Sequence, residues 1–136
     1  MQEQLKCVED FHRKFNVPYK GQPTVQLGLE QSLLRYKLMR EENEEYLDAA
    51  HKGDLEEIAD ALGDMLYILC GTIITHGMQH KIVEVFAEIH RSNLSKLGED
   101  GKPIYREDGK VMKGPNFSRP DIASVLGKGD NQESEG

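Results

Sequence analysis

The run from Met65 to Ile74 limits most strongly how this chain can fold, because it is apolar on nearly every side of a helix. A helix with apolar residues all round is normally buried among other parts of the protein. The run is also far shorter than the roughly 20 residues that a transmembrane helix needs. We therefore expect a central helix covered by other helices, in an all-α protein.

Acidic residues crowd the segment just before this run, where ten of the 25 residues from 40 to 64 are Asp or Glu. At 100° per residue, Glu42 and Glu45 continue the apolar stripe of their helix, whereas Glu44 points the opposite way. Two acids of this helix are therefore expected to face inward.

The following helix shows the same pattern, since Glu57, Asp60 and Asp64 share one face at helical spacing. Two like charges about 4 Å apart repel by roughly 4 kcal/mol at an effective dielectric near 20, so facing carboxylates need protons or cations. Oxygen ligands without a Cys or His cluster favour Mg²⁺, with Mn²⁺ as a substitute. The alternative is a solvated acidic surface, and Glu57 could serve only to cap its helix after Asp54.

Composition narrows the classes of partner. The chain has 136 residues, enough for one domain, and a net charge of −7, which argues against nucleic acid or an anionic membrane as a partner. A polyphosphate ligand whose charge is met by bound metal remains compatible with this charge. Cys7 and Cys70 form no disulfide framework and no apolar leader is visible, so we expect a cytoplasmic protein.

Helical spacing and breakers predict a four-helix-type bundle over residues 1–97, followed by a hairpin and loop extension over 98–126 and a disordered tail over 127–136. The four helices are expected at about 2–15, 25–51, 54–76 and 79–97. Asp108-Gly109 signals a type I′ hairpin turn. Because the third helix is apolar on more sides than one bundle can bury, we expect a homodimer or homotetramer.

Two motifs suggest a family. Glu41, Glu42 and Glu45 fit E-E-x-x-E, and "DALGDMLYIL" follows after one short connection. Together, over about residues 5–97, they resemble the all-α nucleotide pyrophosphohydrolases, the MazG-like and phosphoribosyl-ATP pyrophosphohydrolase-like superfamily. The resemblance implies Mg²⁺-dependent hydrolysis of a nucleoside triphosphate, with a common or modified base and possible deoxyribose, to the monophosphate and pyrophosphate.

The resemblance also implies roles for individual acids. In that superfamily the E-E-x-x-E acids and an E-x-x-D on the next helix bind the metal, which here points to Glu42, Glu45 and Asp64. The glutamate of E-x-x-D falls on Ala61, a departure for which Glu57 or Asp60 could substitute. Among Glu41, Glu42 and Glu45, an acid that does not ligate the metal could orient or deprotonate the attacking water.

Other residues are candidates for substrate binding. Asn93 and Lys96 form an N-x-x-K that resembles the family's sugar and phosphate contacts, although Lys96 could simply favour a helix C-terminus. Lys110 and Lys113 of the hairpin could close over phosphates or remain solvated. His12 could line a base pocket or be a structural histidine.

Two other classes of protein fit part of the sequence. A di-iron carboxylate bundle would use pairs such as Glu9-x-x-His12, but Glu42 and Glu45 have no histidine at the required offset. A non-catalytic, metal-dependent nucleotide-binding protein would explain Ala61 as the mark of a lost activity.

Overall fold

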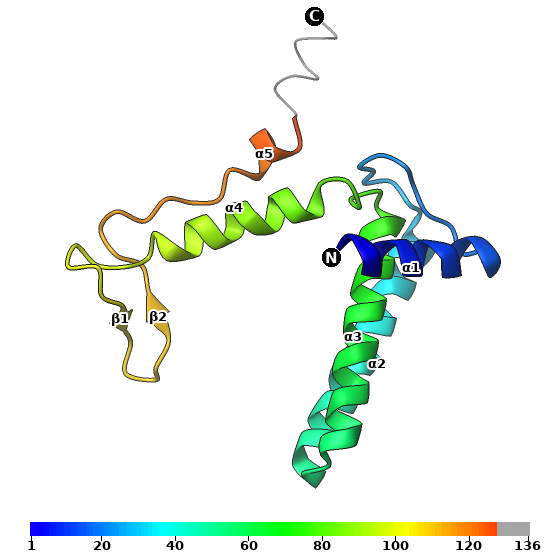
Figure 1. The fold of residues 1–136 in the computed structure, drawn as a ribbon, viewed down its shortest axis with the longest axis horizontal. Coiled ribbons are helices and arrows are strands. Elements are labelled where there is room, and N and C mark those ends of the chain that lie inside the picture. The colour runs from blue at the N-terminus through cyan, green and yellow to red at the C-terminus, as the bar shows by residue number, and fades with distance from the viewer. Residues whose placement is uncertain (128–136) are drawn as a thin grey trace, which may run out of the picture. The chain divides into compact units, whose positions relative to one another are not determined.

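A computed structural model describes residues 1–127, and the predicted tail lies outside the described residues from position 128 onward. Within residues 1–127 the chain forms five helices and one two-stranded sheet, so the expected all-α fold with a small hairpin is confirmed (Figure 1). The elements are α1 (Gln2–Lys14), α2 (Leu29–Lys52), α3 (Leu55–Thr75), α4 (Ile82–Leu94), β1 (Ile104–Tyr105), β2 (Val111–Met112) and α5 (Ile122–Val125).

The chain divides into two compact units, the first spanning Met1–His80 and the second beginning at Lys81. In the first unit α2 and α3 run side by side and α1 lies across the end where α3 finishes (Figure 1). The fourth helix thus belongs with the hairpin, while the domain boundaries expected from the sequence stay a prediction.

A tight reversal joins α2 to α3 and sets their alignment. Gly53 ends α2 in the left-handed region, at φ 70°, which glycine adopts without strain. Asp54 then caps α3, because its carboxylate accepts the backbone N–H of Glu57 at 3.1 Å. Asp54 is thus the N-cap of α3, whereas the Glu57 side chain lies against Lys52 and does not cap the helix. The reversal places the acids of both helices near one another.

Helix α2 begins at Leu29 rather than near residue 25, because the preceding segment is bound to the end of α3. Thr24 donates its N–H to the carbonyl of His76 at 2.8 Å, and Lys20 donates to Ile74 at 3.1 Å. The ring Nδ1 of His76 lies 2.8 Å from the carbonyl oxygen of Thr24. These contacts satisfy backbone groups that a longer helix would otherwise have used.

A buried arginine joins the helices of the first unit. Arg35 of α2 is only 5% exposed and donates from Nη2 to the carbonyl of Ile68 at 3.0 Å and from Nε to Thr72 at 3.2 Å. His12 of α1 is buried beside it, and burial followed by the charge of Arg35 lowers the pKa of this histidine. Arg35 was not among the residues that the sequence pattern pointed to.

Substitution of the glycine under this arginine should weaken the fold. A Cβ on Gly71 would lie 2.4 Å from Nη2 of Arg35 and 3.1 Å from Nε2 of His12. We expect Gly71→Ala to lower the free energy of unfolding by about 1–3 kcal/mol. Gly63→Ala is the matched control in the same helix, since a Cβ there meets nothing within 4 Å. The control should raise stability by about 0.5–1 kcal/mol, and urea unfolding that showed equal gains for both variants would contradict this account of Arg35.

The second unit contains α4, the hairpin and α5. Ile104 pairs with Met112 and Tyr105 with Val111 in the antiparallel hairpin. The predicted type I′ turn is wrong: only Gly109 has a positive φ, 88°, whereas type I′ needs two such residues. Gly109 donates its N–H to the carbonyl of Arg106, as in a type I turn closed by a glycine bulge.

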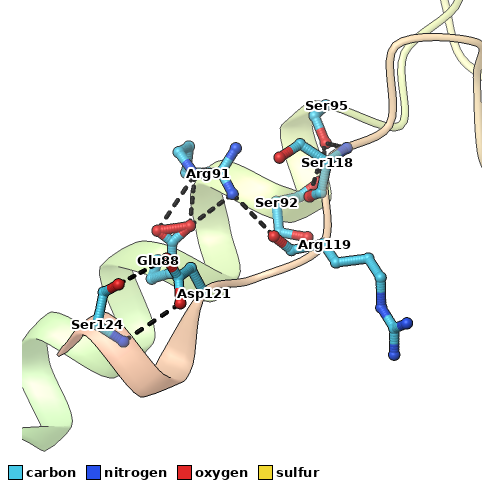
Figure 2. Close-up of polar contacts among 8 residues, drawn as sticks. All are labelled: Glu88, Arg91, Ser92, Ser95, Ser118, Arg119, Asp121 and Ser124. Atoms are coloured by element: carbon cyan, nitrogen blue, oxygen red, sulfur yellow. Dashed lines mark hydrogen bonds and ion pairs between the residues drawn. The ribbon is translucent and has the colours of Figure 1, made fainter. Parts of the chain in front are cut away.

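The segment after the hairpin returns along α4 and is fixed to it by side chains (Figure 2). Arg91 forms an ion pair with Glu88 and donates to the carbonyl of Arg119 at 3.2 Å. Ser95 accepts the N–H of Ser118 at 2.9 Å. Arg91 and Ser95 therefore hold the loop after the hairpin against α4.

Helix α3 is long and apolar enough to cross a membrane by length and composition alone. Core helices of soluble proteins satisfy the same criterion, and Asp60 and Asp64 lie within this helix. Carboxylates in the hydrocarbon of a bilayer are costly, so this one helix does not indicate a membrane protein.

Candidate metal centre

Three carboxylates converge between α2 and α3. Glu42 and Glu45 come from α2 and Asp64 from α3, and one oxygen of each lies within 4.8 Å of the others. Glu42 and Asp64 are half-buried, whereas Glu45 is exposed. A group of this size, open on one side, can hold one cation and leave further coordination positions free for water or substrate.

Local geometry explains the convergence. Glu42 and Glu45 are three residues apart and share one face of α2. The short reversal at Gly53 makes α2 and α3 antiparallel neighbours, so Asp64 lies beside this face about three turns into α3. The three acids converge as the sequence pattern predicted, but only Glu42 and Asp64 are half-buried, while Glu45 is exposed.

The cluster is electrostatically unfavourable without a cation. Burial, then a hydrogen bond with Glu45 and then the charges of Glu45, Asp64 and Asp60 raise the pKa of Glu42 to about 6. Its Oε2 is buried and has no hydrogen-bond partner among the described residues. A buried carboxylate oxygen without a partner, in a residue whose carboxylate converges with two others, fits a hard divalent cation such as Mg²⁺ or Mn²⁺.

The raised pKa predicts how stability depends on pH when metal is chelated. The fold favours protonated Glu42, so this contribution is fully present below the reference pKa of 4.5 and is lost as pH rises through about 6. The loss is at most about 2 kcal/mol, and partial exposure of the site reduces it. We expect Glu42→Gln to abolish this component, which urea unfolding in EDTA at pH 4.5 and 7.5 would measure.

Comparing the Glu42→Gln variant with the wild type removes the contributions of the other acids to the pH dependence of stability. Glu41→Gln is the control, because Glu41 neighbours Glu42 in sequence but is exposed. Equal pH dependence in the wild type and the Glu42→Gln variant would contradict the claim that protonation of Glu42 stabilises the fold. Saturating Mg²⁺ should stabilise the wild type more at pH 7.5 than at pH 4.5, since protons compete with the metal.

The other acidic candidates lie toward the reversal. Glu57 and Asp60 line a groove of about 270 Å³ together with Glu45 and Ala61. Glu57 lies 3.4 Å from Lys52 in an exposed ion pair, while Asp60 contributes to the field at Glu42. Ala61 is buried at 3% exposure, so the position to which the resemblance assigns a glutamate is packed as an apolar residue.

The substrate-binding candidates are distributed over both units. His12 is packed against Arg35 and Gly71 rather than among the acids. Lys96, Lys110 and Lys113 line one pocket of the second unit, and Asn93 is exposed on α4. The same pocket includes Arg106, which was not among the predicted residues, although its place opposite Lys110 across the expected turn indicates that the two side chains are close.

Residues 8–93, well over half of the chain, match the PRA-PH family, phosphoribosyl-ATP pyrophosphohydrolase. The chain belongs to this family.

One similar solved structure comes from Exiguobacterium sp. 255-15 and is that of a candidate NTP pyrophosphohydrolase. It is 26% identical, covers 97% of this chain and 96% of its own, and has a TM-score of 0.47. No curated protein matches this chain. The assignment to a family of pyrophosphohydrolases therefore rests on the family match and suggests hydrolase activity.

Proposed function

We propose that this protein hydrolyses a nucleoside triphosphate to the monophosphate and pyrophosphate with Mg²⁺, for which Mn²⁺ can substitute. The observation that carries the proposal is the convergence of Glu42, Glu45 and Asp64 in a chain of this family. Facing carboxylates destabilise a fold unless protons or a cation neutralise them, and a Mg²⁺ held by few carboxylates commonly bridges to phosphates. We place this activity in the cytoplasm.

The roles of the residues follow from their positions. Glu42, Glu45 and Asp64 would hold the cation, which when bound neutralises phosphate oxygens and lowers the pKa of a bound water. The charge of Asp60 helps to raise the pKa of Glu42, so the two carboxylates are close. Glu41 is exposed on α2, the helix that also carries Glu42. Either acid, if it does not ligate the cation, can accept a proton from the attacking water.

Product analysis tests the proposal. Ribo- and deoxyribonucleoside triphosphates, with common and modified bases, are incubated with the protein and Mg²⁺, Mn²⁺ or EDTA. We expect monophosphate and pyrophosphate in equal amounts with either cation and neither product in EDTA. Diphosphate and orthophosphate would contradict the reaction, and metal-dependent binding without products would favour the non-catalytic nucleotide-binding protein.

We further propose that the protein is a homo-oligomer, a dimer or a tetramer. Between α2 and α3 lies a hollow of about 520 Å³, lined by Tyr36, Met39, Arg40, Asn43, Met65, Leu66 and Leu69. Leu66 is 43% and Leu69 47% exposed, and adjacent large apolar side chains of this kind mark an interaction surface. The same face of a second copy is the proposed occupant.

Light scattering measures the oligomeric state directly. We expect the wild type to be dimeric or larger at micromolar concentration and Leu66→Glu to dissociate it. Leu55→Glu is the control: Leu55 is 78% exposed and lies outside the hollow, so this variant should retain the wild-type mass. A monomeric wild type would overturn the proposal.

A further inference from the structure

The buried arginine of α2 lies on the face of the helix that carries the inward acids. Arg35 precedes Glu42 by seven residues, which is two helical turns and about 10 Å along the axis. Its acceptor Ile68 follows Asp64 by four residues, one turn farther along α3. Arg35 therefore joins α2 to α3 beyond the acid cluster, on the side away from the reversal at Gly53.

Burial of this arginine is costly. Its side chain is 5% exposed, and within residues 1–127 it takes part in no ion pair. Burial lowers the pKa of the guanidinium, and the neighbour from α1 is the buried His12, which supplies no negative charge. Apolar side chains of similar volume are often as stabilising as buried charges, or more so. Stability alone therefore does not explain an arginine at this position.

The hydrogen bonds of Arg35 hold one turn of α3 at a defined position against α2. Nη2 donates to the carbonyl of Ile68 at 3.0 Å and Nε donates to Oγ1 of Thr72 at 3.2 Å. Gly71 lies on the same turn and leaves room for the guanidinium, because a Cβ there would overlap with Nη2. A planar guanidinium bound twice to one turn fixes distance and direction, whereas apolar contacts are not directional.

The acceptors of Arg35 do not depend on it. Thr72 donates its hydroxyl to the carbonyl of Ile68 at 2.9 Å, so both groups keep a hydrogen bond when the arginine is removed. Replacement of Arg35 by an apolar residue therefore leaves neither acceptor unpaired, and such unpaired groups are what makes the loss of a buried partner destabilising.

The charge of Arg35 would oppose a cation in the acid cluster, because like charges repel. Removal of the charge alone should therefore strengthen metal binding. Loss of a defined geometry should weaken metal binding instead. The two possible effects of Arg35 on the cluster thus differ in sign, which makes them separable by experiment.

We propose that Arg35 is a positioning residue that holds Asp64 opposite the acids of α2. The reversal at Gly53 fixes one end of the helix pair and Arg35 fixes the other side of the acids. Mg²⁺ needs near-ideal geometry at oxygen distances of about 2.0–2.1 Å, whereas a slip of one residue shifts a side chain by about 1.5 Å and turns it by about 100°. This role rests on the metal site of the proposed function.

Arg35→Met tests the role, since methionine removes the charge and both hydrogen bonds but remains long and unbranched. We expect its urea midpoint to equal or exceed that of the wild type and its Kd for Mn²⁺ at pH 7.5, followed by electron paramagnetic resonance, to rise about tenfold or more. Lys37→Met removes the same charge from an exposed position of α2 and should bind Mn²⁺ like the wild type.

A second pair of variants tests the same hydrogen bonds while Arg35 is retained. Thr72→Val removes the hydroxyl that accepts from Nε of Arg35, and it should also weaken Mn²⁺ binding. Thr72→Ser keeps this hydroxyl and should retain the wild-type affinity. A lowered urea midpoint with unchanged affinity in Arg35→Met would show a merely structural role and overturn the proposal, as would tighter binding.

A distance between α2 and α3 tests the positioning without metal. Nitroxide labels on Glu44→Cys and Leu62→Cys, both at exposed positions, are placed in a chain carrying Cys7→Ser, while buried Cys70 stays unlabelled. With excess unlabelled protein added, pulsed electron paramagnetic resonance should show a shifted or broader distance distribution in Arg35→Met and not in Lys37→Met.

The distance measurement separates this role from the proposed function. The same distance distribution in Arg35→Met and in the chain with Arg35 would overturn the role. A wild type that binds no Mn²⁺ would contradict the proposed function, and a changed distribution in Arg35→Met would then still support Arg35 as the residue that positions α3 against α2.

Discussion

Asp64→Asn should lower kcat for pyrophosphate release by about 10³-fold while the protein remains folded. Asp64 is the only carboxylate that α3 contributes to the three-residue cluster, and asparagine keeps its shape while removing its charge. Asp64 would be one of the ligands of the proposed cation, and losing it would weaken the stabilisation of phosphate charge that the cation would supply. A factor of 10³ corresponds to about 4 kcal/mol. A coupled assay for pyrophosphate at saturating nucleotide would measure it.

The chain offers a matched control for this variant. Glu44 lies one residue from Glu45 but is exposed on the opposite side of α2, where it lies 3.9 Å from Arg40. Glu44→Gln removes the same charge and should leave kcat within about twofold, because an exposed ion pair contributes little. Equal losses in both variants would show that overall charge, and not the cluster, sets the rate.

The largest effect on stability is expected at Gly77. This glycine has φ 70°, and a Cβ there would lie 2.0 Å from the carbonyl oxygen of Gln22. The contact is with backbone, which cannot rotate away as a side chain can. We expect Gly77→Ala to cost about 3 kcal/mol or more, from the left-handed conformation and from displacement of the segment bound to the end of α3. Thermal unfolding compared with wild type would measure the loss.

Gly53→Ala separates the two causes. Gly53 has the same φ of 70°, but a Cβ there meets nothing within 4 Å. Its substitution should therefore cost only the conformational term, about 1–2 kcal/mol. If the two variants lost equal stability, the close approach of Gln22 to Gly77 would contribute nothing.

The helices and the inward acids could be predicted because local chemistry determines them. Gly53 and Asp54 mark the reversal between α2 and α3, and the 3.6-residue period then orients Glu42, Glu45 and Asp64. These features depend on residues close together in the sequence.

The features that were missed depend on contacts between distant segments. In the sequence, Arg35 is one of several charged residues of a helix. Only the packing of α3 against α2 shows that it is buried. The later start of α2 follows from hydrogen bonds between Thr24 and His76, 52 positions apart. The predicted turn type at Gly109 was wrong because the Asp-Gly dipeptide does not determine how many residues the hairpin loop contains.

Mn²⁺ binding followed by electron paramagnetic resonance tests the central claim most directly, because it reports the metal site without turnover. We predict saturable Mn²⁺ binding by the wild type near pH 7.5, competition by Mg²⁺, retention in Glu44→Gln and loss in Asp64→Asn. Identical binding by wild type and Asp64→Asn would contradict the assignment of the metal to Glu42, Glu45 and Asp64.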